Sequence, residues 1–253
     1  MRARRAVPPG CQGARGGALL TAKVTAQDRL LFYERFADEF DARMNRYEVT
    51  KRLRLIYEVA LAGHDLSGRD LLDAGCGTGL FSQVAVERGA RVTSVDVGEG
   101  LLAQVARKCD SRRIVGSVTE LPFDDASFDY VLCTEVIEHT TTPSRAVSEL
   151  ARVLRPDGTL VLTTPNRVWH PAIRIATALK LRPYEGLENW VRWRDLRGWI
   201  ESEGLELLDY RGFNALPFVH PITYGLVDRL DRFGNAWLGR WMINILAVAR
   251  RPA

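Results

Sequence analysis

Long apolar runs and paired cysteines are both missing from this sequence of 253 residues. No apolar run reaches the roughly 18 residues that a membrane-spanning helix needs, and the first residues contain too few apolar side chains for a secretory signal. The four cysteines, Cys11, Cys76, Cys109 and Cys133, show no C-x-x-C spacing. These absences argue against a membrane-embedded protein and against a disulfide-rich secreted domain, and they predict a cytoplasmic protein in a reducing compartment.

The main part of the chain also lacks an excess of basic residues, although the whole chain has a net charge of +4. The first 23 residues contain five basic side chains and no acidic one, so the rest of the chain carries −1. A protein that binds nucleic acid over a large surface needs a basic stripe on its fold. We therefore expect no nucleic-acid partner. Residues 1–24, which are rich in arginine, glycine and proline, are predicted to be a disordered basic leader.

What the sequence does contain is a glycine-rich stretch, Leu71 to Ser82, in which an apolar run ends in Asp73 and three alternating glycines follow. The glycines are Gly75, Gly77 and Gly79. They allow left-handed backbone and let a ligand approach without meeting a Cβ, as in a strand, a tight turn and a helix start. The next predicted strand, residues 91–97, contains Asp96, where nucleotide-binding folds place an acid that accepts both ribose hydroxyls. The stretch therefore predicts a nucleoside ligand.

The spacing of the glycines distinguishes between nucleoside ligands. Dinucleotide enzymes seat a pyrophosphate on G-x-G-x-x-G, whereas this loop reads D-x-G-x-G-x-G and places Asp73 where a pyrophosphate would be repelled. A carboxylate suits a cation, and S-adenosyl-L-methionine carries a sulfonium and an ammonium group. The loop and Asp96 resemble the cofactor motifs of class I S-adenosylmethionine-dependent methyltransferases, over roughly residues 48–250.

The resemblance implies a set of cofactor contacts. The loop would seat the cofactor and Asp96 would clamp the ribose. Ser117 and the backbone of Val118 would meet the adenine, because the acid that relatives often carry at position 117 is absent. The implied cofactor-binding residues are Asp73, Gly75, Cys76, Gly77, Gly79, Asp96, Val97, Ser117 and Val118.

Predicted strands and helices alternate along the chain, which indicates an α/β fold with a doubly wound sheet. After the first strand, strands are expected at residues 91–97, 112–116, 128–134, 159–164, 205–211 and 242–250. The resemblance implies a seven-stranded, mostly parallel, Rossmann-like sheet whose last strand is antiparallel and inserts between the fifth and sixth. Residues 25–253 would form a single methyltransferase domain. Its helices over residues 25–64 either help to close the site or simply cover one face of the sheet.

A second candidate site follows the predicted fourth strand, in the segment EVIEHT that begins at Glu135. Open α/β sheets bind their ligands at the carboxyl ends of strands. If the segment forms a helix, Glu135, Glu138 and His139 share one face. The segment resembles the E-x-x-E-H motif of the ubiquinone-biosynthesis O-methyltransferases and of the enzymes that methylate the 2′-hydroxyl at small-RNA 3′ ends. In the metal-dependent members a hard cation such as Mg2+ contacts the hydroxyl that is methylated.

The role of these three residues stays open. Relatives supply a further downstream histidine as a metal ligand, and no histidine here lies in the matching stretch, Tyr184 to Trp199. Either the three side chains hold Mg2+, which would lower the pKa of the acceptor hydroxyl, or His139 is a metal-free general base, or the cluster only orients the cofactor. His170, between Trp169 and Pro171, is a second candidate base.

The carboxyl-terminal part has the composition of a variable substrate region. All six tryptophans lie beyond Pro165, and residues 165–190 and 212–240 are predicted to be insertions on the substrate side. The second insertion carries an apolar stripe at helical spacing, Ile222, Leu226, Leu230, Phe233 and Trp237. Such a stripe is ordinary packing, a lid for an apolar substrate or a foothold on a membrane surface, so residues 222–241 are a candidate for peripheral membrane contact.

The sequence as a whole favours methyl transfer from S-adenosyl-L-methionine to an oxygen of a small-molecule or lipid-like acceptor. This displacement mostly requires that the nucleophile be aligned and its proton removed. Because these residues do not fix the nucleophile, N- and C-methylation stay open, as does a non-catalytic module that binds the cofactor without turnover. A small-RNA end is disfavoured by the near-neutral body. The sequence does not indicate the oligomeric state.

Overall fold

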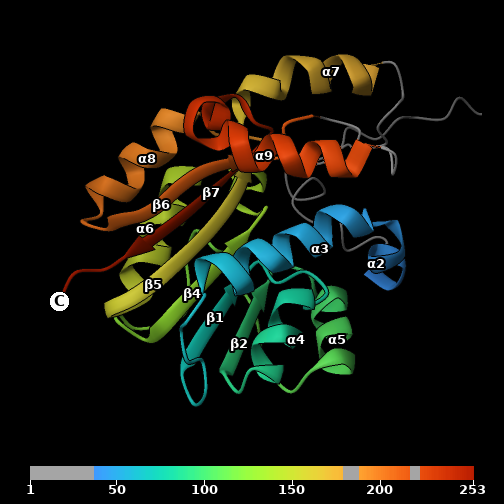
Figure 1. The fold of residues 1–253 in the computed structure, drawn as a ribbon. Helices are drawn as coiled ribbons and strands as arrows, with labels where there is room; N and C mark the ends of the chain where they lie inside the picture. Colours follow the sequence, from blue (N-terminus) through green and yellow to red (C-terminus); the bar gives the residue numbers. More distant parts are fainter. Residues whose placement is uncertain (1–36, 179–187, 217–222) are drawn as a thin grey trace, which may run out of the picture.

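The computed structural model describes residues 37–178, 188–216 and 223–253 (Figure 1). The strands are β1 (Asp70–Ala74), β2 (Arg91–Asp96), β3 (Arg112–Val115), β4 (Phe128–Thr134), β5 (Leu154–Pro165), β6 (Glu206–Phe213) and β7 (Asn244–Arg250). The α-helices are α2 (Phe40–Arg43), α3 (Arg46–Arg54), α4 (Leu80–Glu87), α5 (Glu99–Lys108), α6 (Pro143–Val153), α7 (His170–Ala178), α8 (Trp193–Ser202) and α9 (Tyr224–Leu238). A π-helical turn, Leu55–Ala60, continues α3, and 3-10 turns occupy Ile137–His139, Arg167–Trp169 and Gly239–Trp241. The predicted leader, residues 1–24, lies outside the described residues.

The strands form one seven-stranded sheet in the order β3-β2-β1-β4-β5-β7-β6. Strands β1 to β5 pair in parallel, and β7 pairs antiparallel with both β5 and β6. The prediction of a doubly wound sheet with an inserted antiparallel last strand is confirmed. Strands β2 and β3 are added on one side of β1, whereas β4 and β5 are added on the other side, so the strand order switches between β1 and β4. A crevice is therefore expected at the carboxyl ends of these two parallel strands.

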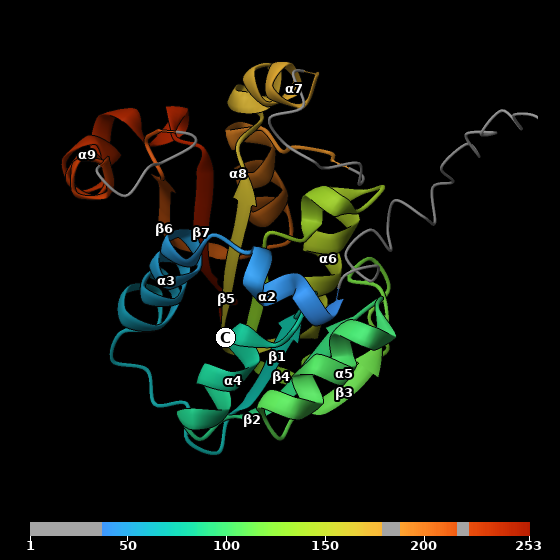
Figure 2. The same cartoon turned by 90° about the vertical axis from the view of Figure 1, so that its right-hand side faces the viewer.

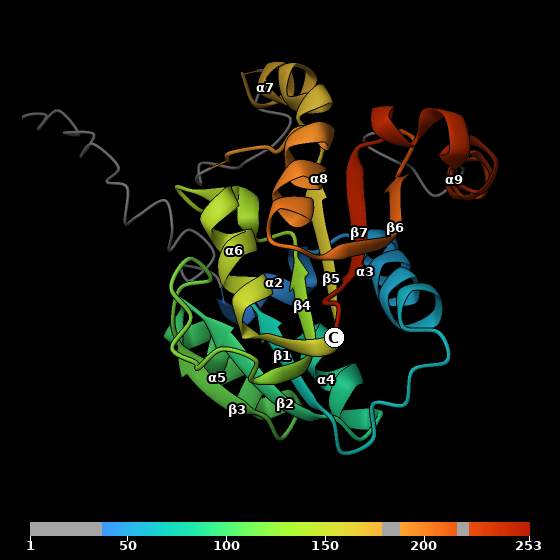
Figure 3. The same ribbon diagram turned by 90° about the vertical axis from the view of Figure 1, so that its left-hand side faces the viewer.

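Helices cover both faces of the sheet, as Figures 2 and 3 show from opposite sides. Helices α6 and α8 pack on one face, where Leu150 and Leu196 are fully buried, and α4 with the π-helical turn packs on the other, where Ile56 is fully buried. Successive residues of β1 alternate between the two layers, since Leu71 belongs to one apolar cluster and Leu72 to the other. The sheet is therefore buried on both sides, as a parallel sheet requires.

Strand β5 begins earlier than the predicted 159–164 and directly follows α6. The Pro156-Asp157-Gly158 segment is an irregularity within the strand, because the register with β4 shifts between Phe128 and Tyr130. Asp157 has a left-handed φ of 62° there. A bulge can absorb extra residues without ending the strand pairing, which a sequence pattern does not reveal.

Helices α7 and α9 lie beyond the carboxyl edge of the sheet, within the two predicted insertions (Figure 1). The stripe predicted on α9 is not its packed face, because Leu226 and Leu230 are exposed whereas Val227 is buried. Ile222 and the side chains of Phe233 and Trp237 lie outside the described part. In the ranges that the structure describes, no helix combines the length and the apolar character that crossing a bilayer requires.

Candidate active site

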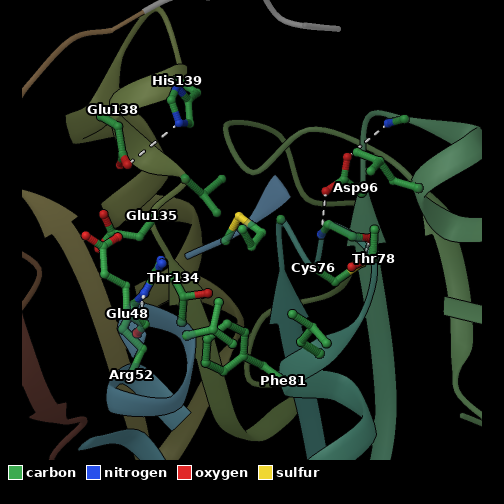
Figure 4. Close-up of a pocket in the computed structure, with 18 of the residues that line it drawn as sticks. Glu48, Arg52, Cys76, Thr78, Phe81, Asp96, Thr134, Glu135, Glu138 and His139 are labelled. Carbon is green, nitrogen blue, oxygen red and sulfur yellow. Dashed lines mark hydrogen bonds and ion pairs between the residues drawn. The ribbon is translucent and has the colours of Figure 1, made fainter. Parts of the chain in front are cut away.

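A cavity of about 470 Å³ lies at the predicted crevice, between the glycine loop and the ends of β2 and β4 (Figure 4). Asp96 and the glycine loop form one side, and Glu135, Glu138 and His139 form the other. Helix α3 closes the cavity with residues that include Glu48 and Arg52. The structure therefore brings the two candidate sites of the sequence into one space.

The glycine loop takes the strained backbone that its sequence permits. Gly75, Gly77 and Gly79 have φ values of 76°, 54° and 82°. A Cβ on Gly75 would lie 2.5 Å from the methyl groups of Val136, so only glycine fits there. Gly75, Cys76 and Gly77 line the cavity, whereas Gly79 precedes α4 and packs against Val105. The loop thus presents bare backbone to the cavity.

The Asp96 carboxylate is fixed at the cavity wall by the backbone. It accepts hydrogen bonds from the Gly77 amide at 2.9 Å and the Gly98 amide at 3.0 Å. Val97, which is exposed at the end of β2, and Leu101 of α5 line the cavity beside it. Charge and an apolar wall are therefore adjacent, as a ribose and an adenine ring would require.

Asp73 does not face this cavity, contrary to the expectation that its carboxylate would meet a cationic ligand. Its side chain is fully buried, and Oδ2 accepts a hydrogen bond of 2.6 Å from the Ser82 hydroxyl. The hydroxyls of Ser82 and Ser94 lie 2.8 Å apart, and Ser94 donates to Ser111 at 2.9 Å. Burial raises the pKa of Asp73 to about 6, against the lowering effect of Ser82. Asp73 thus joins strand β1 to helix α4.

The predicted adenine contacts also lie outside the cavity lining. Ser117 bonds locally, since its hydroxyl lies 2.8 Å from the Thr119 hydroxyl and accepts from the Thr119 amide at 3.2 Å. Val118 is buried within the apolar cluster on the α6 side. The residues that line the cavity beside Asp96 are instead Val97 and Leu101.

The segment after β4 is not a continuous helix. Glu135 is left-handed with φ 56°, and only Ile137–His139 form a 3-10 turn. Asn244 donates to Glu135 Oε2 at 2.8 Å, and Thr164 donates to Glu138 Oε2 at 2.9 Å. His139 Nε2 lies 3.8 Å from Glu138 Oε1. The expectation that the two acids and the imidazole share one helical face is therefore wrong.

Two buried acids in this small space have raised pKa values. Burial raises the pKa of Glu135 to about 7, with Arg52 opposing the shift and Glu138 adding to it. Burial likewise raises the pKa of Glu138 to about 8, opposed by the Thr164 hydrogen bond and Arg52. Glu135 Oε1 is buried and has no hydrogen-bond partner of good geometry among the described residues. The Thr163 side chain also lowers the pKa of Glu135 through a hydrogen bond of poorer geometry.

The predicted Mg2+ site is not formed by these side chains. Within residues 37–178, 188–216 and 223–253, no group of three histidine, cysteine or acidic side chains is arranged to hold a metal ion. The left-handed backbone at Glu135 takes its carboxylate off the face that Glu138 and His139 would share. The donor set that is present does not fit a hard cation, which binds several oxygen ligands at a common point.

His170 lies away from this cavity. It begins α7, and its ring centroid is 5.7 Å from that of Trp190. His139 lines the cavity, with a side chain that is 21% exposed. Of the two candidate bases, only His139 is placed to reach a ligand there.

Arg52 and Glu48 are cavity residues that the sequence analysis did not identify. Arg52 is 9% exposed, and its Nε donates to the Glu48 carbonyl at 3.4 Å. The two residues are one helical turn apart, so both side chains project from the same face of α3. The sequence shows only charged residues on a predicted helix, and it does not show which loop that helix covers.

Helix α2 joins the loop from the other side. The Thr78 hydroxyl donates to Asp41 at 2.6 Å, and Asp41 also pairs with Lys108 of α5. The amino-terminal helices therefore do both things that the sequence left open: α3 borders the cavity, with α2 bonded to the glycine loop beside it, and the π-helical turn after α3 packs on the sheet with Tyr57.

The sheet order, the left-handed glycine loop and the acid at the end of β2 define a nucleoside-binding α/β enzyme fold. Residues 72–162 match the family model described as a methyltransferase domain. The chain is 33% identical over 182 residues to the ubiquinone biosynthesis O-methyltransferase of Hahella chejuensis. The aligned region covers 66% of this chain and 74% of that protein. The chain belongs to the class I S-adenosylmethionine-dependent methyltransferases, and S-adenosyl-L-methionine is the cofactor of this family.

Solved structures share the fold at low identity. An S-adenosylmethionine-dependent methyltransferase from Mesorhizobium loti aligns with a TM-score of 0.58 at 18% identity, over 86% of this chain and 100% of that one. The [4+2]-cyclase SpnF aligns with a TM-score of 0.63 at 19% identity, over 90% and 97%. The fold thus also occurs in a protein described as a cyclase, so the acceptor chemistry has to be argued from the cavity.

Proposed function

We propose that this enzyme methylates a hydroxyl oxygen of a small, lipid-like acceptor. The observation that carries the proposal is the group after β4: an imidazole and two buried acids with raised pKa values line the side of the cavity opposite Asp96. The similarity to a ubiquinone biosynthesis O-methyltransferase supports an acceptor of this class.

The cofactor would lie along the glycine loop. Asp96 would accept hydrogen bonds from the ribose hydroxyls, and Val97 with Leu101 would contact the adenine ring. Arg52 would pair with the carboxylate of the methionine part. Among the described residues its guanidinium makes one hydrogen bond, from Nε, so its other N–H groups remain for a ligand. A planar guanidinium suits a carboxylate because it can form two parallel hydrogen bonds.

When bound, S-adenosyl-L-methionine supplies a methyl group by in-line displacement at its sulfonium. The protein's own part is to hold the acceptor hydroxyl in line and to remove its proton. Glu135 Oε1 would accept a hydrogen bond from the acceptor and orient it. His139 would take the hydroxyl proton, and the Glu138 side chain, whose Oε1 lies 3.8 Å from Nε2, would orient the imidazole. No step is assigned to a metal, because the three side chains do not converge.

Two assays test this proposal. Calorimetry with S-adenosylhomocysteine measures cofactor binding without any acceptor. Methyl transfer is then followed from methyl-labelled cofactor to alkyl-substituted catechols, with matched anilines and amines as N-acceptors. An O-methylated product supports the proposal, whereas labelling of the amines alone would establish N-methylation. Binding of the cofactor without turnover of any acceptor favours the alternative of a non-catalytic binding module.

An activity assay in excess chelator tests whether methyl transfer requires a metal ion. If His139 acts as a metal-free base, activity persists in excess chelator. Loss of activity in chelator that Mg2+ restores would show that a ligand-induced rearrangement builds the metal site that this structure does not contain.

We further propose that α9 and the turn after it contact a lipid surface. Leu226, Leu238 and Trp241 are 52%, 53% and 53% exposed, and the Arg240 guanidinium lies over the Trp241 ring at 5.4 Å. Exposed apolar side chains beside arginine favour an anionic membrane surface. Flotation with phosphatidylglycerol vesicles tests this: wild type should float, and Leu226→Glu combined with Trp241→Glu should not. Wild-type protein that stays at the bottom of the gradient contradicts the proposal.

A further inference from the structure

Helix α3 carries two polar faces with different surroundings. Glu48 and Arg52 line the cavity. Tyr47 and Lys51, each one position earlier, contact α9 instead. Residues four apart share a helical face, and residues one apart point about 100° away from each other. The contacts that Lys51 makes with α9 therefore fix the rotation of α3 about its axis, and with it the direction in which Arg52 points.

Lys51 joins α3 to two acids of α9. Its Nζ lies 2.6 Å from Asp231 and 3.1 Å from Asp228. The Lys51 and Asp231 side chains are each 11% exposed, whereas Asp228 is 48% exposed. Losing one partner of a largely buried pair has a far larger effect than losing an exposed one. Figures 1 and 2 both place α3 beside α9 at this point.

Asp231 also connects to the opposite side of the cavity. It accepts hydrogen bonds from the amides of Asn214 at 2.8 Å and Ala215 at 2.9 Å. Asn214 donates to Asn244 Oδ1 at 3.1 Å, and Asn244 donates to Glu135 Oε2 at 2.8 Å. We call the residues Lys51, Asp231, Asn214, Asn244 and Glu135 the α9 chain. It begins on α3 and ends at Glu135, which lines the cavity.

We propose that Lys51 and Asp231 are positioning residues: through the α9 chain they hold Arg52 and Glu135 at opposite sides of one cavity. The inference rests on the proposed function, because it takes Arg52 as the ligand of the cofactor carboxylate. Asp228 shares Lys51 with Asp231 and accepts a hydrogen bond from Tyr47, but among the described residues it makes no hydrogen bond to the amides of Asn214 or Ala215. It is therefore the matched control.

The test is a double-mutant cycle in the full chain, with S-adenosylhomocysteine affinity measured by calorimetry. Arg52→Met removes a charge-assisted hydrogen-bonding group, and we expect it to weaken binding about tenfold or more in the wild-type background. Asp231→Asn should weaken binding as well. If Asp231 acts by positioning Arg52, Arg52→Met in the Asp231→Asn background should cost about threefold or less. In the Asp228→Asn background it should keep its full cost.

Additive losses for Asp231→Asn and Arg52→Met, or equal behaviour of the two aspartate variants, would overturn the inference. A general loss of stability would weaken binding but would not create such selective coupling. Should Asp231→Asn fail to fold, Lys51→Met is compared with Lys51→Arg, which keeps the charge. Rescue by arginine supports the positioning role, and equal loss in both variants contradicts it. Wild-type protein that does not bind S-adenosylhomocysteine instead refutes the proposed function.

Discussion

Substitution of Gly75 by alanine tests the conclusion that the loop must present bare backbone. Gly75 has a φ of 76°, and a Cβ placed there would lie 2.5 Å from both methyl groups of Val136. A left-handed conformation costs an alanine about 1–2 kcal/mol, and forcing an extra methyl group into a packed site costs about 1–3 kcal/mol. The free energy of unfolding should therefore fall by about 2–5 kcal/mol.

A change of this size is measurable without unfolding the protein outright. Single domains are stable by about 5–15 kcal/mol, and each kcal/mol shifts the Tm by about 2–4 °C in a domain of this size. The expected decrease in Tm is therefore roughly 4–20 °C. Because Gly75 also lines the cavity, S-adenosylhomocysteine affinity should fall as well, by about two- to tenfold if one backbone contact is lost.

The neighbouring valine separates the two contributions. Val136→Ala removes both methyl groups at 2.5 Å and leaves the Val136 Cβ at 3.0 Å. In the double variant the steric part should be relieved, and the left-handed backbone cost should remain. The decrease in Tm of the double variant should therefore be smaller than the sum of the decreases in the two single variants. Purely additive Tm changes, or a Gly75→Ala variant as stable as wild type, would refute the reasoning.

Three further predictions concern the site. Asp96→Ala removes the acceptor of the Gly77 and Gly98 amides and the proposed ribose ligand, so S-adenosylhomocysteine affinity should fall at least about 100-fold by calorimetry; a loss below threefold would contradict the ribose assignment. His139→Gln should leave that affinity nearly unchanged and lower kcat by about 10²–10⁴-fold in the methyl-transfer assay, and unchanged turnover would show that His139 is not the base. Glu138 has a folded pKa of about 8 against an ordinary value of 4.5, so the folded protein keeps a proton that the unfolded chain releases. The contribution of Glu138 to the free energy of unfolding is therefore fully present below pH 4.5 and is lost as the pH rises toward about 8. Tm should decline over this pH range, and Glu138→Gln should make the decline less steep. An equally steep decline in the variant would assign it to other groups.

Much of the fold could be predicted because its signals are local. Strand β4 has the predicted bounds, and β2, β3, β6 and β7 differ by one or two residues at their ends. Periodicity and glycine punctuation act over a few residues, so they survive in the folded chain. The exception, β5, begins early because Asp157 adopts a left-handed conformation and lets the strand continue.

The site was predicted less completely because facing directions are not local. Asp73 stands at the predicted loop, but Ser82 and the burial of β1 turn its carboxylate inward. Glu138 and His139 lie at the cavity as expected, yet the left-handed Glu135 breaks the helical face assumed for them. Arg52 was missed because only the packing of α3 over the crevice brings it there.

The sequence by itself determined the class of ligand, because alternating glycines and a following acid constrain the backbone and charge of one short loop. It also determined the order of the elements, since hydrophobic period and turn residues are properties of neighbouring positions. Only the tertiary structure decided which charged groups share the cavity. Arg52, Glu135 and Asp96 come from three distant segments, and their distances depend on how α3, β4 and β2 pack together. Side-chain direction at such a junction is set by the surrounding packing, which no single segment of sequence contains.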